Sequence, residues 1–171
     1  MKRVVIKIHD FCNFVGRFSG KLSALILVVL VVMILWEVFT RSILHDPAVW
    51  VEPFTIYGLV ALSFVSAANT MNKNMHVSVD IVVRRLKPRN QLVFQIFTHL
   101  IALAYTVVLM VLGTQSAYQA YQMGSKDITV MLTPLYIPYA FVPIGLLLLA
   151  LVIIGKIMEN IMILKGWQKQ R

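Results

Sequence analysis

Three short patterns of charged residues are the places where this sequence could carry chemistry. His76 stands four residues before Asp80, and Asp80 stands four residues before Arg84. On a helix the second spacing makes an acid-before-base ion pair. Glu37 precedes Arg41 by the same spacing at the end of a long apolar run. A carboxylate inside a membrane span is by default a candidate for proton or substrate coupling, so Glu37 is the first residue to weigh.

Glu37 has two interpretations. It could be the coupling carboxylate of a stand-alone small exporter with four spans. Alternatively, it is a structural anchor, because it lies in the last turn of its span, next to Trp36 and within pairing distance of Arg41. Coupling sites of transporters lie nearer the membrane midplane. We therefore favour the structural anchor.

Cofactor and enzyme chemistry find little support in the sequence. It has no Gly-rich phosphate loop and no HExxH, CxxC or Gly-x-Ser-x-Gly motif. Of the four histidines only His99 falls within an apolar span, whereas a transmembrane haem needs two. We expect His99 to hydrogen-bond between helices. The chain is predicted not to be an enzyme and to hold no cofactor or metal, with a membrane-anchor subunit of a redox enzyme as an alternative.

The composition places these residues in a membrane protein. The chain has 171 residues, of which 59% are hydrophobic and 13% charged, whereas soluble domains carry about 25% charged residues. We predict an all-α integral membrane protein with four transmembrane helices and short interfacial amphipathic helices, in one domain. The predicted spans are 22–41, 54–72, 90–122 and 134–162, with an interfacial segment at 1–21 and an amphipathic cytoplasmic helix at 77–87.

The second span differs from the others in its small residues. Ser63, Ser66, Ala67 and Ala68 would let neighbouring helices approach closely, so we expect this helix to face protein more than lipid. Internal repeats, which secondary transporters usually show, are not evident. The chain is therefore not expected to transport a solute alone.

The basic residues predict how the chain crosses the membrane. Lys and Arg number sixteen, and fourteen of them lie in the N-terminal segment, the connector between the second and third spans, and the C-terminal tail. Arg41 and Lys126 are the two in the other loops. Cytoplasmic loops carry the excess of Lys and Arg, so both termini are predicted to be cytoplasmic.

Several motifs in order give the chain a family resemblance. Arg41 ends the first span, Trp50-Val51-Glu52 lies in the first loop, Ala67-Ala68 lies toward the end of the second span, and His76-Val77-Ser78-Val79-Asp80 follows that span. Ile137-Pro138 and Pro143-Ile144-Gly145 open the fourth span. The arrangement resembles the small membrane subunit of TRAP (tripartite ATP-independent periplasmic) transporters over residues 22–155. Pro53 and Ser66 depart from it, standing where the family usually has a second glutamate and a glycine.

The resemblance implies a non-catalytic subunit of a Na⁺-coupled importer of an organic acid. A large multi-span permease subunit would hold the substrate and Na⁺ sites, and a periplasmic substrate-binding protein would deliver the substrate. Membrane lipids would be the other partner, and nucleic acid would not be one. C4-dicarboxylates and sialic acid are the substrate types implied, with sialic acid favoured on general likeness alone. The implied location is the bacterial inner membrane.

The resemblance also implies roles for individual residues, either in subunit contacts or in the local fold. Trp50 and Glu52 would shape the outer rim near the delivery protein. His76 and Asp80 would stabilise the connector, with Asp80 as a helix cap or as the partner of Arg84. The fourth span would be shaped for packing on the large subunit by Pro138, Pro143 and Gly145.

The predicted orientation can be tested by labelling single cysteines in spheroplasts. A cysteine at Ser125 should react with a membrane-impermeant reagent added from the periplasmic side, and one at Asn74 should react only after the membrane is opened. The reverse pattern would contradict the orientation.

Overall fold

The computed structural model describes residues 2–73, 88–127 and 132–169, with side chains described for 11–73, 90–127, 132–164 and 166. Almost all of these residues are helical. The elements are α1 (Lys2–Phe39), the π-helix η1 (Thr40–Leu44), α2 (Val51–Asn72), α4 (Pro88–Gln122) and α5 (Tyr136–Lys169). Residues 77–87, predicted as an amphipathic helix, lie outside the described residues.

Within the described parts of the chain, four helices are long and apolar enough to cross a membrane: Phe11–Leu44, Val51–Asn72, Asn90–Gln122 and Tyr136–Leu164. This confirms the all-α membrane fold. The helix α1 runs without a break from Lys2 to Phe39, so residues 2–21, predicted as an interfacial segment, are continuous with the first span. Its 38 residues measure about 57 Å, nearly twice the roughly 30 Å of a hydrocarbon core.

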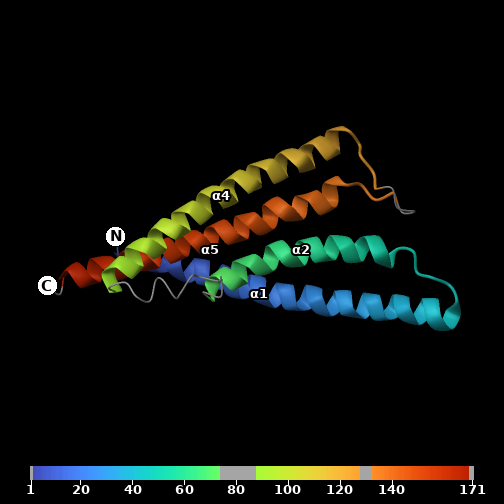
Figure 1. The fold of residues 1–171 in the computed structure, drawn as a ribbon, viewed down its shortest axis with the longest axis horizontal. Helices are drawn as coiled ribbons and strands as arrows, with labels where there is room; N and C mark the ends of the chain where they lie inside the picture. Colours follow the sequence, from blue (N-terminus) through green and yellow to red (C-terminus); the bar gives the residue numbers. More distant parts are fainter. Residues whose placement is uncertain (1, 74–87, 128–131, 170–171) are drawn as a thin grey trace.

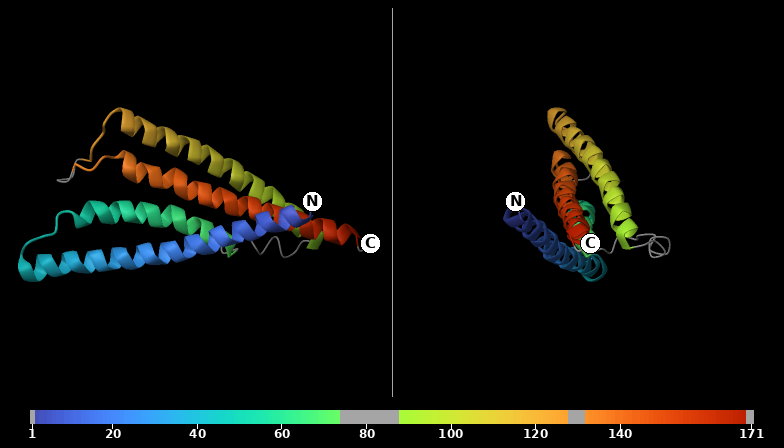
Figure 2. Two further views of the ribbon diagram at one scale, coloured as in Figure 1. Left: turned by 180° about the vertical axis from the view of Figure 1, so that it is seen from behind. Right: turned by 90° about the vertical axis from the view of Figure 1, so that its left-hand side faces the viewer.

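The four long helices form an open row rather than a closed bundle. Figure 1 shows the order α1, α2, α5 and α4 across the row. Helix α5 is the central element, since it packs on α4, α2 and α1. The N-terminal part of α1 crosses toward the C-terminal part of α5, as the views in Figure 2 show. Both faces of the row are therefore left for lipid or for another protein.

The row has two different ends. At one, which we call the terminal end, lie both chain termini, the end of α2 and the start of α4 (Figure 1). At the other, the loop end, lie residues 45–50 between η1 and α2, and the described parts of the connection between α4 and α5, residues 123–127 and 132–135. Because each long helix runs from one end of the row to the other, both termini lie at the same end of the row.

Backbone conformation explains how the chain turns at the loop end. His45 and Gly124 both have positive φ, 55° and 58°, and follow the ends of η1 and α4. Such a left-handed residue stops a helix and turns its last carbonyls toward new donors. Beyond Gly124, Ser125 and Leu135 lie side by side, with the Leu135 N–H donating a hydrogen bond to the Ser125 carbonyl at 3.0 Å.

Two prolines lie near the start of α5 without interrupting it. Pro138 is in the first turn, where a backbone N–H has no intrahelical acceptor, so its ring costs little there. Pro143 lies inside the helix, where the missing N–H leaves the carbonyl one turn earlier short of a donor.

The best-buried apolar cluster lies toward the terminal end, where helices converge. It consists of Val15, Ala68, Met71, Val152 and Ile153, with Ala102 and Leu103 of α4 packed against it. In a bilayer lipid tails are as apolar as these side chains, so transfer from water does not drive their association. Close packing of the helices must supply the attraction instead.

Glycines set that close packing. A Cβ at Gly145 of α5 would lie 2.5 Å from the Cβ of Phe64 and 2.8 Å from its backbone carbon. A Cβ at Gly155 would lie 2.5 Å from the Cβ of Cys12, in α1. The backbone of α5 thus contacts α2 and α1 at distances that only glycine permits.

Replacing Gly145 with alanine should therefore destabilise the protein, by about 1–3 kcal/mol, because the clash is with backbone that cannot rotate away. Gly166→Ala is the matched control, since Gly166 lies on the same helix and has no atom within 4 Å of its virtual Cβ. It should be neutral or slightly stabilising. Thermal unfolding in detergent measures both, and equal midpoints for the two variants would contradict the proposed contact.

Candidate functional site

The connector pattern of the sequence analysis lies outside the described residues. This holds for His76, Asp80 and Arg84, all within 74–87. Their proposed roles remain predictions.

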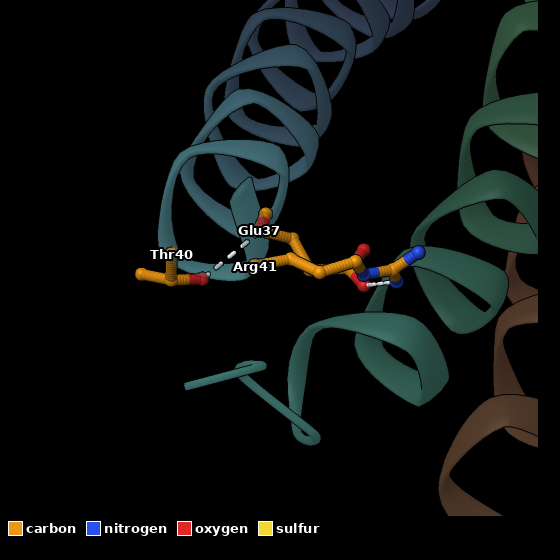
Figure 3. Close-up of polar contacts among 3 residues, drawn as sticks. All are labelled: Glu37, Thr40 and Arg41. Atoms are coloured by element: carbon orange, nitrogen blue, oxygen red, sulfur yellow. Dashed lines mark hydrogen bonds and ion pairs between the residues drawn. The ribbon is translucent and has the colours of Figure 1, made fainter. Parts of the chain in front are cut away.

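Glu37 lies at the end of α1 and is paired. Its carboxylate accepts a hydrogen bond from the guanidinium of Arg41, four residues further along the chain, as predicted. Its backbone carbonyl accepts a hydrogen bond from the Thr40 hydroxyl at 3.0 Å. Figure 3 shows the three residues together where α1 passes into η1. The Glu37 side chain is mostly covered, whereas that of Arg41 is about two-thirds exposed. The pair fits a structural role at the edge of the span, because Arg41 lies where its charge can reach water.

Trp50 and Glu52 lie at the loop end, at the start of α2. Trp50 is partly exposed and meets Phe54 edge to face, with ring centroids 6.4 Å apart. Glu52 is exposed in the first turn, where the positive end of the helix dipole favours a carboxylate. Pro53, the departure from the family pattern, is fully buried in that same turn, where the missing N–H is tolerated.

A contact that the sequence did not reveal joins α2 to the connection between α4 and α5. The Tyr57 hydroxyl on α2 donates to the Asp127 carboxylate, which lies in the connection between α4 and α5. Tyr57 also packs on Phe54, so an unbroken series of contacts runs from Trp50 to Asp127. Asp127 is fixed in turn by its backbone N–H, which donates to the Thr133 carbonyl at 2.8 Å. We call Trp50, Phe54, Tyr57, Asp127 and Thr133 the loop-end rim.

The predicted residues of the fourth span lie on both sides of α5. Gly145 is buried against Phe64 of α2. Pro143 faces α4, where its Cδ would be 3.5 Å from a Cβ at Gly113. Pro138 is buried nearer the loop end. These residues shape contacts of α5 inside the chain, which is the local-fold role that the sequence analysis set beside a partner contact.

One side of α1 packs against other helices, and we call this side its seam. It was not predicted from the sequence. Cys12, Gly16, Ser19 and Ser23 are buried along one side of this helix. Asn72 of α2 packs directly on Gly16. Gly16-x₃-Gly20 and Ser19-x₃-Ser23 are small-residue spacings typical of helix contacts in membranes, and they were the available signal.

Burial separates the inner helices from the outer ones. In the most apolar stretch of each span, 28% of the residues are buried in α2 and in α5, against 11% in α1 and 6% in α4. Residues of the second span are thus buried within the chain more often than those of the first and third spans. Helix α4 packs mainly on α5 and exposes the rest of its surface, including the large side chains Phe97, Tyr105 and Tyr118.

The titratable residues that the structure describes do not gather into a metal site. Among the described residues no group of three or more His, Cys, Asp or Glu could hold a metal ion. His99, for which we expected a partner on another helix, instead lies with Nδ1 against the Gln95 carbonyl of its own helix.

Comparison with known proteins supplies the family. A family model described as "Tripartite ATP-independent periplasmic transporters, DctQ component" matches residues 30–162. The chain belongs to this family. A search of curated proteins found no match. The protein is therefore a small component of a TRAP transporter, which is a transporter family and not an enzyme family, and it is a multi-pass membrane protein.

For this DctQ component, Tyr57→Phe tests whether the loop-end rim is held by its hydrogen bond. The change keeps the ring on Phe54 but removes the donor to Asp127, a charge-assisted bond worth about 1.5–3 kcal/mol when buried and less at this partly exposed site. The amides of Asp127 and Leu135 should exchange with deuterium several-fold faster.

Tyr105→Phe is the matched control, because Tyr105 is exposed in the middle of α4, away from the rim. It should leave the exchange of Asp127 and Leu135 unchanged. If Tyr57→Phe also leaves that exchange at the wild-type rate, the hydrogen bond does not hold the rim.

Proposed function

We propose that this protein is the supporting subunit of a Na⁺-coupled TRAP importer of an organic acid, of the sialic acid or C4-dicarboxylate type. The large permease subunit carries the substrate and Na⁺ sites, and the row of helices widens the fixed part of that subunit within the membrane. Family membership supports this division of work. The open row supports it as well, because the central helix is already packed while the outer helices keep free faces.

The observation that carries the proposal is the free face of α4. This helix is 35 residues long and only 6% of its span is buried. Its exposed aromatic side chains are of the type that anchors protein interfaces. A shallow groove lined by Met110, Val111, Thr114, Gln115 and Tyr118 lies on the same helix. Polar side chains such as Gln115 gain more from a protein partner than from lipid. The large subunit packs on this face of α4.

The loop-end rim is the surface proposed to help dock the substrate-binding protein. With both termini cytoplasmic, as the distribution of basic residues predicts, the loop end lies on the periplasmic side of the inner membrane. Trp50 and Glu52 are exposed there, one aromatic and one acidic. The hydrogen bond between Tyr57 and Asp127 holds the start of α2 and the connection between α4 and α5 in a fixed relation, so a partner meets a preformed surface.

Photocrosslinking in the co-expressed complex tests which helix faces the large subunit. Benzoylphenylalanine replacing Tyr105 on α4 should form an adduct with the large subunit. The same replacement at Val28 is the matched control, since Val28 is similarly exposed but lies on α1, at the opposite edge of the row. An adduct from Val28 and none from Tyr105 would contradict the assignment of α4.

Solute uptake tests the supporting role itself. Vesicles that contain this chain and the large subunit, supplied with the binding protein, should take up the organic acid when a Na⁺ gradient is imposed. Vesicles that contain the chain alone should take up none. Uptake by the chain alone, abolished by Glu37→Gln, would instead establish a stand-alone transporter coupled through that carboxylate.

A further inference from the structure

The face of α1 opposite its seam exposes basic and aromatic side chains at its N-terminal part. Successive residues of a helix are about 100° apart. The buried residues Cys12, Gly16, Ser19 and Ser23 therefore share one side. The exposed residues on the other side, at its N-terminal part, are Phe14, Arg17, Phe18 and Lys21.

These four residues combine two cations with two aromatic rings. The rings of Phe14 and Phe18 stack with their centroids 6.3 Å apart. Arg17 and Lys21 are one helical turn apart on the same side, both exposed, and neither forms an ion pair with a described residue. By contrast, Lys156, nearby at the terminal end, is mostly buried and lies 3.3 Å from the Glu159 carboxylate. Arg17 and Lys21 are thus two exposed cations on one side of α1 that are available to a ligand.

The same face becomes purely apolar further along α1. Leu25, Val28 and Val32 follow on it, and each is about 60% exposed. From Lys21 to Arg41 the chain advances twenty residues, about 30 Å along a helix. This distance matches the thickness of a hydrocarbon core, so Lys21 and Arg41 lie at its opposite boundaries. Arg17 and Lys21 therefore lie at the level of the lipid headgroups on the terminal side.

We propose that Arg17 and Lys21 bind the phosphate of an anionic phospholipid, with Phe14 and Phe18 in contact with the upper part of its acyl chains. A guanidinium presents two parallel N–H donors to phosphate oxygens, and an ammonium one turn away adds a second charge. A lipid fits this face because the apolar stripe that would contact its chains continues directly from the cations. The site lies on the side of α1 turned away from α2 and α5, and it is separate from the face of α4.

Native mass spectrometry of the full chain in detergent tests the site. The probes are dioctanoyl phosphatidylglycerol, dioctanoyl phosphatidylcholine and inorganic phosphate. We expect phosphatidylglycerol to bind with preference, and Arg17→Gln/Lys21→Gln to weaken its affinity about 30-fold, the loss that two surface cations predict. The matched control is Lys73→Gln/Lys126→Gln, which removes the same charge from two exposed cations that are not on this face of α1, one at the end of α2 on the packed side of α1 and one at the loop end. It should leave the affinity within about twofold.

Three results of the binding measurements would overturn the proposal. The first is equal binding of the two lipids, and the second is an equal loss in the two double variants. In the third, inorganic phosphate competes fully with the lipid, which would show a free-phosphate site. A separate measurement uses photocrosslinking in the assembled transporter. Benzoylphenylalanine in place of Phe18 should capture phospholipid there. Capture of the large subunit there would show that a protein covers this face, and would likewise overturn the proposal.

Discussion

The close contact of α5 with its neighbours is the constraint on which the structure depends. A bilayer removes the drive that collapses a soluble core, so helices associate only where their surfaces match closely. Gly145 brings the backbone of α5 against Phe64, and Gly155 brings it against Cys12. A side chain at either position would separate the helices and lose the dispersion contacts of the cluster around Val152 and Ile153.

This constraint also explains why the protein is a row and not a closed bundle. The small residues that permit close approach lie on α5, on α2 and on one side of α1, while the described face of α4 away from α5 carries large aromatic side chains. Helix α4 therefore closes one edge with a single neighbour, and α1 exposes the side opposite its seam. Two outer surfaces are thus left exposed: the free face of α4, which is suited to a protein partner, and the outer side of α1, which is suited to lipid.

Polar contacts add local order where the helices end. Arg41 neutralises Glu37 as α1 passes into η1, and Tyr57 ties α2 to the connection that carries Asp127. Both lie at the loop end, where water and headgroups replace hydrocarbon and a charge costs little if it is partnered. The ends of the row are thus specified by hydrogen bonds, and its middle by packing.

The sequence by itself determined the four spans, the all-α class, the family and the pairing of Glu37 with Arg41, because apolar run length and an i,i+4 spacing are local properties. It also indicated a protein-facing second span through its small residues. Only the tertiary structure decided that α5 is central, that α1 is one continuous helix with a packed seam, and that Tyr57 meets Asp127. These features join residues seventy or more positions apart or depend on which side of a helix finds a neighbour, and helical periodicity alone does not specify either.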